Sequence, residues 1–227
     1  MSINWLHRKP YTQQFRFEVF EAYIGLSVID FFAQRFAFKS RDYWLRLIEE
    51  GKITVNRQGV DPNQILKAND LIHTVRDDVQ EPPVNPDYKI IYDQDGVLVI
   101  NKPAPLPVHP AGRFNKNTLL YLLREQHPDR KFHTIHRLDA HTSGVLIMAT
   151  ESQRARFLHL QMEKNQMQKV YGVIAKGDFG TETFVVDLPV GRVCRVKRGY
   201  GAGLEEGKDA KTEFTPLHKP WRMDFYC

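Results

Sequence analysis

The densest group of side chains capable of chemistry lies between residues 133 and 144. This segment reads His-Thr-Ile-His-Arg-Leu-Asp-Ala-His-Thr-Ser-Gly and stands directly before the apolar run 145–149. Loops at the ends of strands often carry functional residues, because a rigid scaffold positions them. A carboxylate can act there as a nucleophile or a general base, and with imidazoles it can bind a metal. The segment is therefore the first candidate for an active site.

A metal centre is one interpretation of this segment. Imidazole and carboxylate groups together suit zinc or iron, as in a metal-dependent hydrolase that would use His133, His136, Asp139 and His141. The spacing, however, matches neither an HExxH helix nor a zinc finger. A polar turn in which Asp139 or Thr142 caps a chain end would need no chemistry at all. From the residues alone, the plain turn is favoured and the metal centre stays open.

Several stretches of the chain resemble the RluA-type pseudouridine synthases. Residues 136–146, His-Arg-Leu-Asp-Ala-His-Thr-Ser-Gly-Val-Leu, are similar to the signature loop of that family. Residues 101–110, with Asn-Lys-Pro and then Pro-Val-His-Pro, resemble its first motif, and residues 169–177 resemble its lysine-tyrosine strand. Residues 189–191 and 207–212 also fit the family's pattern. Because these stretches occur in the family's order, the resemblance outweighs the plain turn.

The resemblance implies isomerisation of uridine to pseudouridine in RNA. That reaction breaks the bond from N1 of uracil to the ribose, rotates the base and joins its C5 to the same sugar carbon. Nothing is oxidised, so no cofactor and no metal are expected, and the chain contains no GxGxxG or P-loop motif. By resemblance Asp139 is the catalytic carboxylate. It would act either as a nucleophile or as a base that removes a ribose proton.

The resemblance also implies roles for neighbouring residues. A target nucleotide must be flipped into a pocket, so Arg137 would occupy the gap and Tyr171 would pack on the flipped uracil. The plainer interpretations are a surface arginine and a core tyrosine. We expect His136 to orient the loop by a hydrogen bond to the backbone, and Lys102 and His109 to shape the fold or contact phosphate.

Composition sets the broad class. A chain of 227 residues with 42% apolar and 26% charged residues can form one or two globular domains, and its net charge of +5 is compatible with a polyanionic partner. Only Cys194 and Cys227 occur, which indicates a reducing compartment. No apolar run approaches a membrane span. We therefore predict a cytoplasmic monomer, with organellar targeting as an alternative because the first residues are basic and poor in acids.

Residues 1–78 predict a small RNA-binding domain of two helices and a few short strands. Ser40 is a plausible N-cap of the second helix and Gly51 is placed to end it. The end of this helix and the strand after it resemble the domain named after ribosomal protein S-four. The expected helices and strands cover residues 27–38, 40–51, 52–56 and 71–75.

A basic patch is the candidate RNA contact of this small domain. Arg41, Arg46 and Lys52 lie on or beside the second helix and could face phosphate groups without reading sequence. A solvated helix face is the alternative. Ribosomal RNA is the first expectation for the substrate and transfer RNA the second.

Residues 79–87 hold three prolines and predict a linker. The catalytic domain would then cover residues 88–227, with an α+β fold built on a mixed, mainly antiparallel sheet. The glycines and charges between residues 197 and 208 predict a mobile loop, and the basic run 195–198 is expected either to contact RNA or to be a solvated charged loop. The expected elements are a hairpin at 90–100, a helix capped by Asn117 that ends at residue 126, a helix capped by Ser152 that ends near residue 165, and buried strands at 145–149 and 170–175.

The carboxyl end departs from the family's pattern. The family continues beyond the segment corresponding to Thr212 into further strands and a motif containing an arginine that pairs with the catalytic aspartate. The chain ends at Cys227 without this motif, and residues 220–227 do not resemble the continuation. A truncated chain is therefore suspected. An inactive RNA-binding pseudoenzyme is the alternative function.

Overall fold

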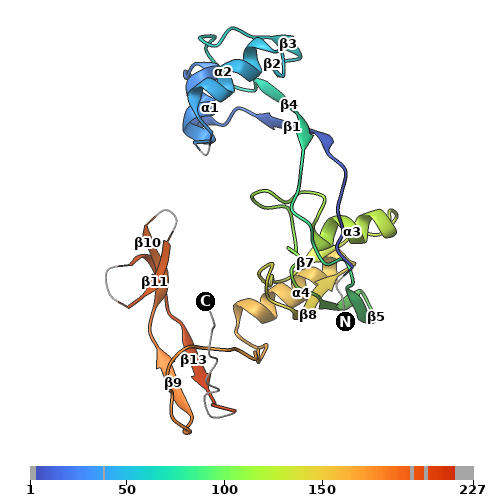
Figure 1. Ribbon diagram of the computed structural model, residues 1–227, viewed down its shortest axis with the longest axis vertical. Helices are drawn as coiled ribbons and strands as arrows, with labels where there is room; N and C mark the ends of the chain where they lie inside the picture. Colours follow the sequence, from blue (N-terminus) through green and yellow to red (C-terminus); the bar gives the residue numbers. More distant parts are fainter. Residues whose placement is uncertain (1–3, 38, 195–196, 202–203, 218–227) are drawn as a thin grey trace, which may run out of the picture. The chain divides into compact units, whose positions relative to one another are not determined.

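The computed structural model of the chain describes residues 4–37, 39–194, 197–201 and 204–217 (Figure 1). It divides into two compact units, Met1–Met167 and Gln168–Cys227. Helices accompany antiparallel strand pairs in the first unit, and every strand pairing among the described residues is antiparallel. This confirms the mixed α+β class with mainly antiparallel sheets. None of the helices in the described ranges is both long enough and apolar enough to cross a membrane.

The amino-terminal part of the first unit is a four-stranded sheet covered by two helices. Its strands lie in the order β1-β4-β2-β3, and a short 3-10 helix, Glu21–Tyr23, follows β1. The strands are β1 (Tyr11–Glu18), β2 (Ile53–Val55), β3 (Gln58–Gly59) and β4 (Leu71–Val79), and the helices are α1 (Val28–Arg35) and α2 (Arg41–Glu49).

A serine side chain caps the amino-terminal end of each of the two helices. The side chain of Ser40 accepts a hydrogen bond from the backbone N–H of Tyr43, and Gly51, with φ +67°, follows the end of α2, both as predicted. The first helix ends at Arg35, before the expected end at residue 38, which lies outside the described residues. Its aromatic side chains pack against Trp44 and form the core of this part.

Strand β1 was not predicted. Most of its residues are polar and only Gln13 is buried. Its sequence therefore lacks the alternation of apolar and polar residues that predicts a strand. It pairs with β4 from Tyr11↔Val79 to Glu18↔Leu71, which also extends β4 beyond the expected end at residue 75. Strand formation here follows from pairing between distant segments of the chain.

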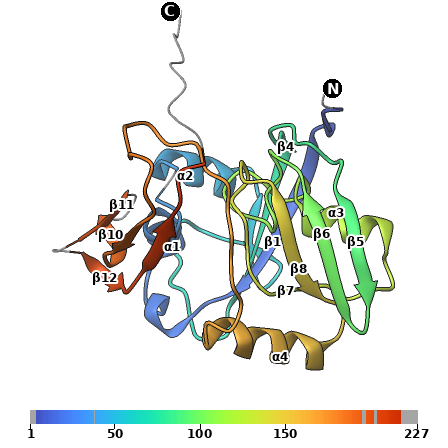
Figure 2. The same ribbon diagram turned by 90° about the horizontal axis from the view of Figure 1, so that it is seen from below.

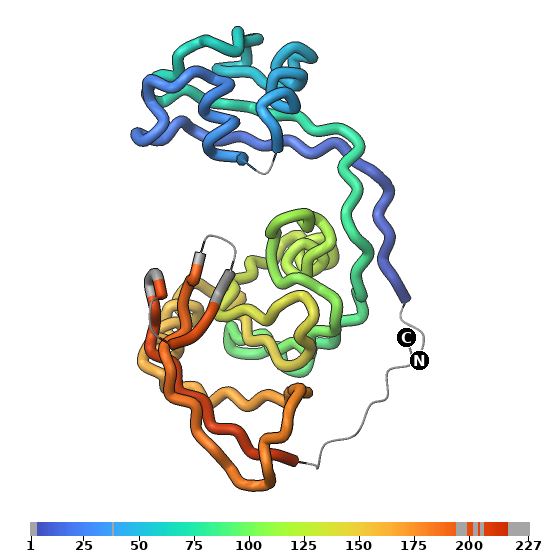
Figure 3. Tube along the Cα trace, turned by 60° about the vertical axis from the view of Figure 1, so that its left-hand side comes forward, coloured from blue at the N-terminus to red at the C-terminus, as the bar shows by residue number. Residues whose placement is uncertain are grey.

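Two segments run side by side from this sheet toward the following part of the unit (Figures 1 and 3). One precedes β1 and the other follows β4, and they are joined by a bridge in which the N–H of Leu6 donates to the carbonyl of Val84 at 2.8 Å. Val84 is fully buried. Apart from Val79, the last residue of β4, the predicted linker 79–87 contains neither a helix nor a named strand, but it is packed against its neighbours.

A second four-stranded sheet forms the other part of the first unit (Figure 2). It has the order β5-β6-β8-β7, and its expected hairpin and its expected strand before residue 149 are confirmed. Apolar side chains of β6 and β8 alternate into a core shared with α3, while α4 packs against β7 and β8 through Ala155 and Leu158. The elements are β5 (Lys89–Gln94), β6 (Val97–Lys102), α3 (Leu119–Gln126), β7 (His133–Thr134), β8 (Gly144–Ala149) and α4 (Ser152–Glu163).

The predicted caps of these two helices are each displaced by one residue. Thr118, not Asn117, caps α3 by accepting from the N–H of Tyr121. Asn117 is instead buried and donates to the carbonyl of Pro82. Ser152 is the first residue of α4 and lies near His133, while the cap position makes no side-chain hydrogen bond.

The second unit consists of short antiparallel strands. The predicted buried strand at 170–175 is wrong, because these residues are exposed and pair with no strand among the described residues. An apolar pattern alone cannot form a strand, since a strand needs a neighbour for its backbone groups. Two strands lie within the predicted mobile loop at 197–208. Residues 195–196 and 202–203 are outside the described residues. The strands are β9 (Phe184–Asp187), β10 (Val190–Cys194), β11 (Lys197–Tyr200), β12 (Glu205–Lys208) and β13 (Lys211–Phe214).

Candidate active site

Asp139 lies in the loop between β7 and β8, at the end of the sheet where β6 also ends. The neighbouring side chain of Leu138 is buried in the core, which directs Asp139 away from it, and the Asp139 side chain is 81% exposed. The N–H of Thr142 donates to the carbonyl of Asp139 at 3.0 Å and closes the turn. The carboxylate is thus presented to solvent by an anchored turn.

Lys102 supports this turn from inside the protein. Its side chain is fully buried, and its ammonium nitrogen donates to the carbonyls of Leu106 at 2.7 Å, Pro103 at 3.0 Å and Ala140 at 3.4 Å. Burial lowers the pKa of Lys102 to about 8, while the negative charge of Asp139 acts in the opposite direction. A buried ammonium group bonded to backbone carbonyls favours a structural role for Lys102 over a contact with phosphate, and this role stays a prediction.

The segment after Lys102 ties the Asp139 turn to α3. The N–H of Leu106 donates to the carbonyl of Ala140 at 2.8 Å, and the carbonyls of Pro107 and Val108 accept from the first turn of the helix. The sequence does not predict these backbone contacts, although the segment 103–110 is rich in proline. Through these contacts, residues 101–110 hold the loop 136–146 in position.

His136 forms a second brace. Its Nε2 accepts a hydrogen bond from the backbone N–H of Ile147 in β8 at 3.0 Å, which places the ring proton on Nδ1. The predicted bond from His136 to the backbone is therefore present. Within the ranges that the structure describes, no three His, Cys, Asp or Glu side chains are arranged to hold a metal ion, so the hydrolase alternative gains no support.

Arg137 projects from the same loop into solvent. Its Nη2 lies 3.5 Å from Oδ1 of Asp139, and its side chain is 64% exposed. An exposed ion pair at this distance contributes little to stability, because water screens it and both side chains lose freedom. The guanidinium group is therefore available to a ligand that approaches the carboxylate.

The structure brings together Asp139, Arg137, His136 and Lys102 around one loop. Tyr171 belongs to the second compact unit, where its side chain is 58% exposed and lies in no strand. The core interpretation of this tyrosine is therefore wrong for the described structure. Its proposed contact with uracil stays a prediction.

The basic patch of the amino-terminal part is largely neutralised. Arg41 is paired with Asp30, and Lys52 contacts Glu50 at 2.8 Å and Asp77 at 3.3 Å. Among the predicted three, only Arg46 makes no ion pair within the described part of the chain. The patch is thus a weaker attractor of phosphate than its sequence indicates.

Comparisons with known proteins agree with this site. The family described as RNA pseudouridylate synthase matches residues 96–223, which include the Asp139 loop. Three relatives are similar over most of this chain. They are the human pseudouridylate synthase RPUSD2 (33% identity over 92% of this chain and 38% of the relative), RNA pseudouridine synthase 7 of Arabidopsis thaliana (32% over 81% and 47%) and the mitochondrial tRNA pseudouridine(32) synthase of Saccharomyces cerevisiae (30% over 92% and 46%).

The chain therefore belongs to the RNA pseudouridylate synthase family. It spans less than half the length of each of these three relatives. The exposed, braced carboxylate of Asp139 lies within the matched residues and is the candidate functional site.

Proposed function

We propose that this chain isomerises uridine in RNA to pseudouridine and that Asp139 is the catalytic carboxylate. The observation that carries the proposal is the exposed Asp139 side chain on a turn held from below by the buried ammonium group of Lys102. A carboxylate held in a fixed position can attack or deprotonate a bound nucleotide without first ordering its own loop.

The proposed reaction keeps every atom of the substrate. The bond from C1′ to N1 breaks, a bond from C1′ to C5 forms, the C5 proton leaves and N1 takes up a proton. Asp139 serves this rearrangement as a nucleophile at the sugar or as a base for a ribose proton. Arg137 is proposed to occupy the space of the flipped nucleotide, with its charge directed to phosphate. Tyr171 is proposed to stack on the uracil.

Transfer RNA is the proposed substrate class ahead of ribosomal RNA. The yeast relatives named for a substrate are a tRNA pseudouridine(32) synthase and a tRNA pseudouridine(31) synthase. These names reverse the order that the resemblance of the sequence alone favoured. The amino-terminal part is proposed as an additional RNA-binding domain of the S-four type. Of the three predicted contacts Arg41, Arg46 and Lys52, Arg46 is the one that makes no ion pair among the described residues.

We also propose that the chain acts as a monomer in the cytoplasm. An organelle is the alternative compartment, since one yeast relative is named as mitochondrial. Fluorescence microscopy of the tagged chain in intact cells distinguishes the two compartments.

Release of tritium from RNA labelled at C5 of uridine tests the activity directly. Transcribed transfer RNA and ribosomal RNA fragments are incubated separately with the wild-type chain, Asp139→Asn and the matched control Asp87→Asn, which changes another exposed aspartate. We expect release by the wild type and the control, and a loss of at least about a hundredfold in Asp139→Asn. A folded wild-type chain that binds RNA without releasing tritium would favour the inactive pseudoenzyme.

A further inference from the structure

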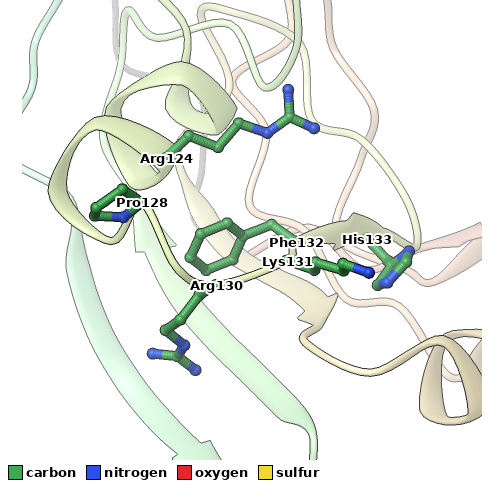
Figure 4. A pocket seen from close by; sticks show the side chains of 6 residues that line it. All are labelled: Arg124, Pro128, Arg130, Lys131, Phe132 and His133. Atoms are coloured by element: carbon green, nitrogen blue, oxygen red, sulfur yellow. The ribbon is translucent and has the colours of Figure 1, made fainter.

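A cavity of about 480 Å³ lies away from the Asp139 loop, between the end of α3 and the start of β7 (Figure 4). Its wall contains three permanent cations and a histidine, and none of its lining residues is acidic. Phe132 is buried at its centre, as Figure 4 shows, with the two arginines on either side. The lining residues are Arg124, Pro128, Arg130, Lys131, Phe132 and His133.

The three cations have different partners. Arg130 is held by two hydrogen bonds to Asp93, both at 2.7 Å, and its guanidinium carbon lies 5.6 Å from the ring centre of Phe132. Arg124 and Lys131 are exposed and form no ion pair with any residue that the structure describes. The cavity therefore has a rigid arginine in its wall and two cations whose charge is not balanced.

A second cavity provides a contrast. It lies beside α2 and is lined by the cations Arg46, Lys52 and Arg76 but also by Glu50, Asp77 and Asp78. Three carboxylates offset three cations there. Of these two cavities, only the one beside α3 carries an excess of positive charge.

We propose that the cavity lined by Arg124 and Lys131 is a second RNA-binding site, which holds a backbone phosphate remote from the target nucleotide. The inference rests on the proposed function, because it assumes that RNA is the substrate. Arginine and lysine side chains at a surface bind the oxygen atoms of phosphate groups, and the nucleic acid then releases its bound counterions. Such contacts do not select a base. An RNA backbone, with its regularly spaced phosphates, is the occupant that fits both the charge and the open position.

The sheet separates this cavity from the catalytic loop. His133 pairs with Ala149, and Ala149 pairs with Val97, whereas Lys102 and Gly144 pair at the opposite end beside the Asp139 turn. Five residue steps along β6 span about 17 Å. One nucleotide cannot reach both places, since phosphates along one strand advance by about 3.4 Å per nucleotide of duplex. The cavity would therefore hold a flanking part of the RNA and set its approach.

Binding of a synthetic stem-loop RNA with uridine only in its loop tests this site independently of turnover. The full chain is compared with the double variant Arg124→Ala/Lys131→Ala and with Arg156→Ala/Lys164→Ala, which removes one exposed cation of α4 and another directly after its end. We expect the first variant to bind about tenfold more weakly and to lose roughly one unit of the slope of log K against log salt. We expect the control to change by less than about twofold.

A gain-of-binding variant excludes misfolding as the cause. Asp93→Asn removes the carboxylate that neutralises Arg130, so RNA binding should become tighter and more salt-dependent. A loss of folding cannot produce tighter binding. The guanidinium group of Arg130 would then add to the charge that Arg124 and Lys131 present.

Three outcomes would overturn the proposal. They are equal weakening by both double variants, unchanged binding by the Arg124/Lys131 variant, and displacement of the RNA by pyrophosphate at a concentration similar to that of the RNA. The last outcome would make the cavity a site for small anions. Tritium release that depends on Asp139 would persist in all three cases if the proposed function is correct, so the two proposals fail separately.

Discussion

The ammonium nitrogen of Lys102 donates to the carbonyl oxygen of Ala140, the residue directly after Asp139, at 3.4 Å. A fully buried cation thereby fixes the backbone beside a largely exposed carboxylate. Buried lysines are rare, because desolvation is costly unless the charge is well bonded. Three carbonyl acceptors and the negative charge of Asp139 offset that cost here.

Replacing Lys102 with methionine should impair turnover more than RNA binding. The variant keeps the length of the side chain but removes the donor that links the carbonyls of Pro103, Leu106 and Ala140, and only the N–H of Leu106 still holds Ala140, so the Asp139 turn loses part of its brace. We expect kcat for tritium release to fall by more than about tenfold, while KM changes little. Lys164→Met, which changes an exposed lysine directly after α4, is the matched control. An unchanged kcat in Lys102→Met would contradict the positioning role.

The pKa of Lys102 predicts a dependence of stability on alkaline pH. Since burial lowers this pKa from 10.5 to about 8, the folded chain gives up its proton before the unfolded chain does. The stabilising contribution is complete above 10.5 and is lost as the pH falls through 8. Denaturant unfolding between these values should show wild-type stability rising relative to Lys102→Met, by on the order of 1–3 kcal/mol. Parallel curves for the two proteins would refute the assignment.

Arg137→Ala should separate function from stability. The ion pair of Arg137 with Asp139 is long and exposed, so we expect the free energy of unfolding to change by less than about 0.5 kcal/mol. We expect kcat/KM for RNA to fall by at least about tenfold, because the cation beside the carboxylate is lost. Arg137→Lys should recover part of the affinity for RNA but not the planar contact. Full activity in Arg137→Ala would exclude the proposed role.

Glu81 joins the two parts of the first unit and should be important for stability. Its carboxylate accepts from the Tyr11 hydroxyl and from the backbone N–H groups of residues 115–117. We expect Glu81→Gln to lower the free energy of unfolding at neutral pH by about 1–3 kcal/mol and to speed proteolysis near residues 79–87. Glu49→Gln, an exposed carboxylate, serves as the control.

Acid should remove the advantage of Glu81. Burial acts to raise the pKa of Glu81, but the hydrogen bonds from Tyr11 and the backbone lower it below its ordinary value of 4.5. Its contribution is therefore present above 4.5 and disappears as the pH falls through the lower folded value. The stability difference between wild type and Glu81→Gln should shrink over this range. A difference that grows with acid would contradict the bond pattern.

Local chemistry made part of the fold predictable. Ser40 and Gly51 delimit α2 because a hydroxyl cap and a left-handed glycine act within one turn. The hairpin at 90–100 follows from apolar residues on both sides of a short turn at Asp95 and Gly96. The carboxylate at Asp139 was located by resemblance, since its residues alone favoured a plain turn.

Other features depend on partners that a local pattern does not contain. Strand β1 exists because Tyr11 to Glu18 pairs with β4, and the residues at 170–175 are not a strand because no described neighbour pairs with them. The neutralisation of Arg41 and Lys52 depends on carboxylates brought close by folding. The burial of Lys102 likewise depends on tertiary packing. The neighbouring residues in the sequence therefore did not decide whether Lys102 supports the fold or contacts phosphate.

The pairing of Tyr11 with Val79 brings the entry and exit of the amino-terminal sheet next to each other. Opposite residues of an antiparallel pair lie about 5 Å apart, a distance that a short turn can close. The segment between Tyr11 and Val79 can therefore be removed or replaced as one unit. A tight reverse turn between residues 10 and 80 would retain the Leu6–Val84 bridge, and a foreign binding domain with adjacent termini could be grafted at the same point to give the chain another binding partner.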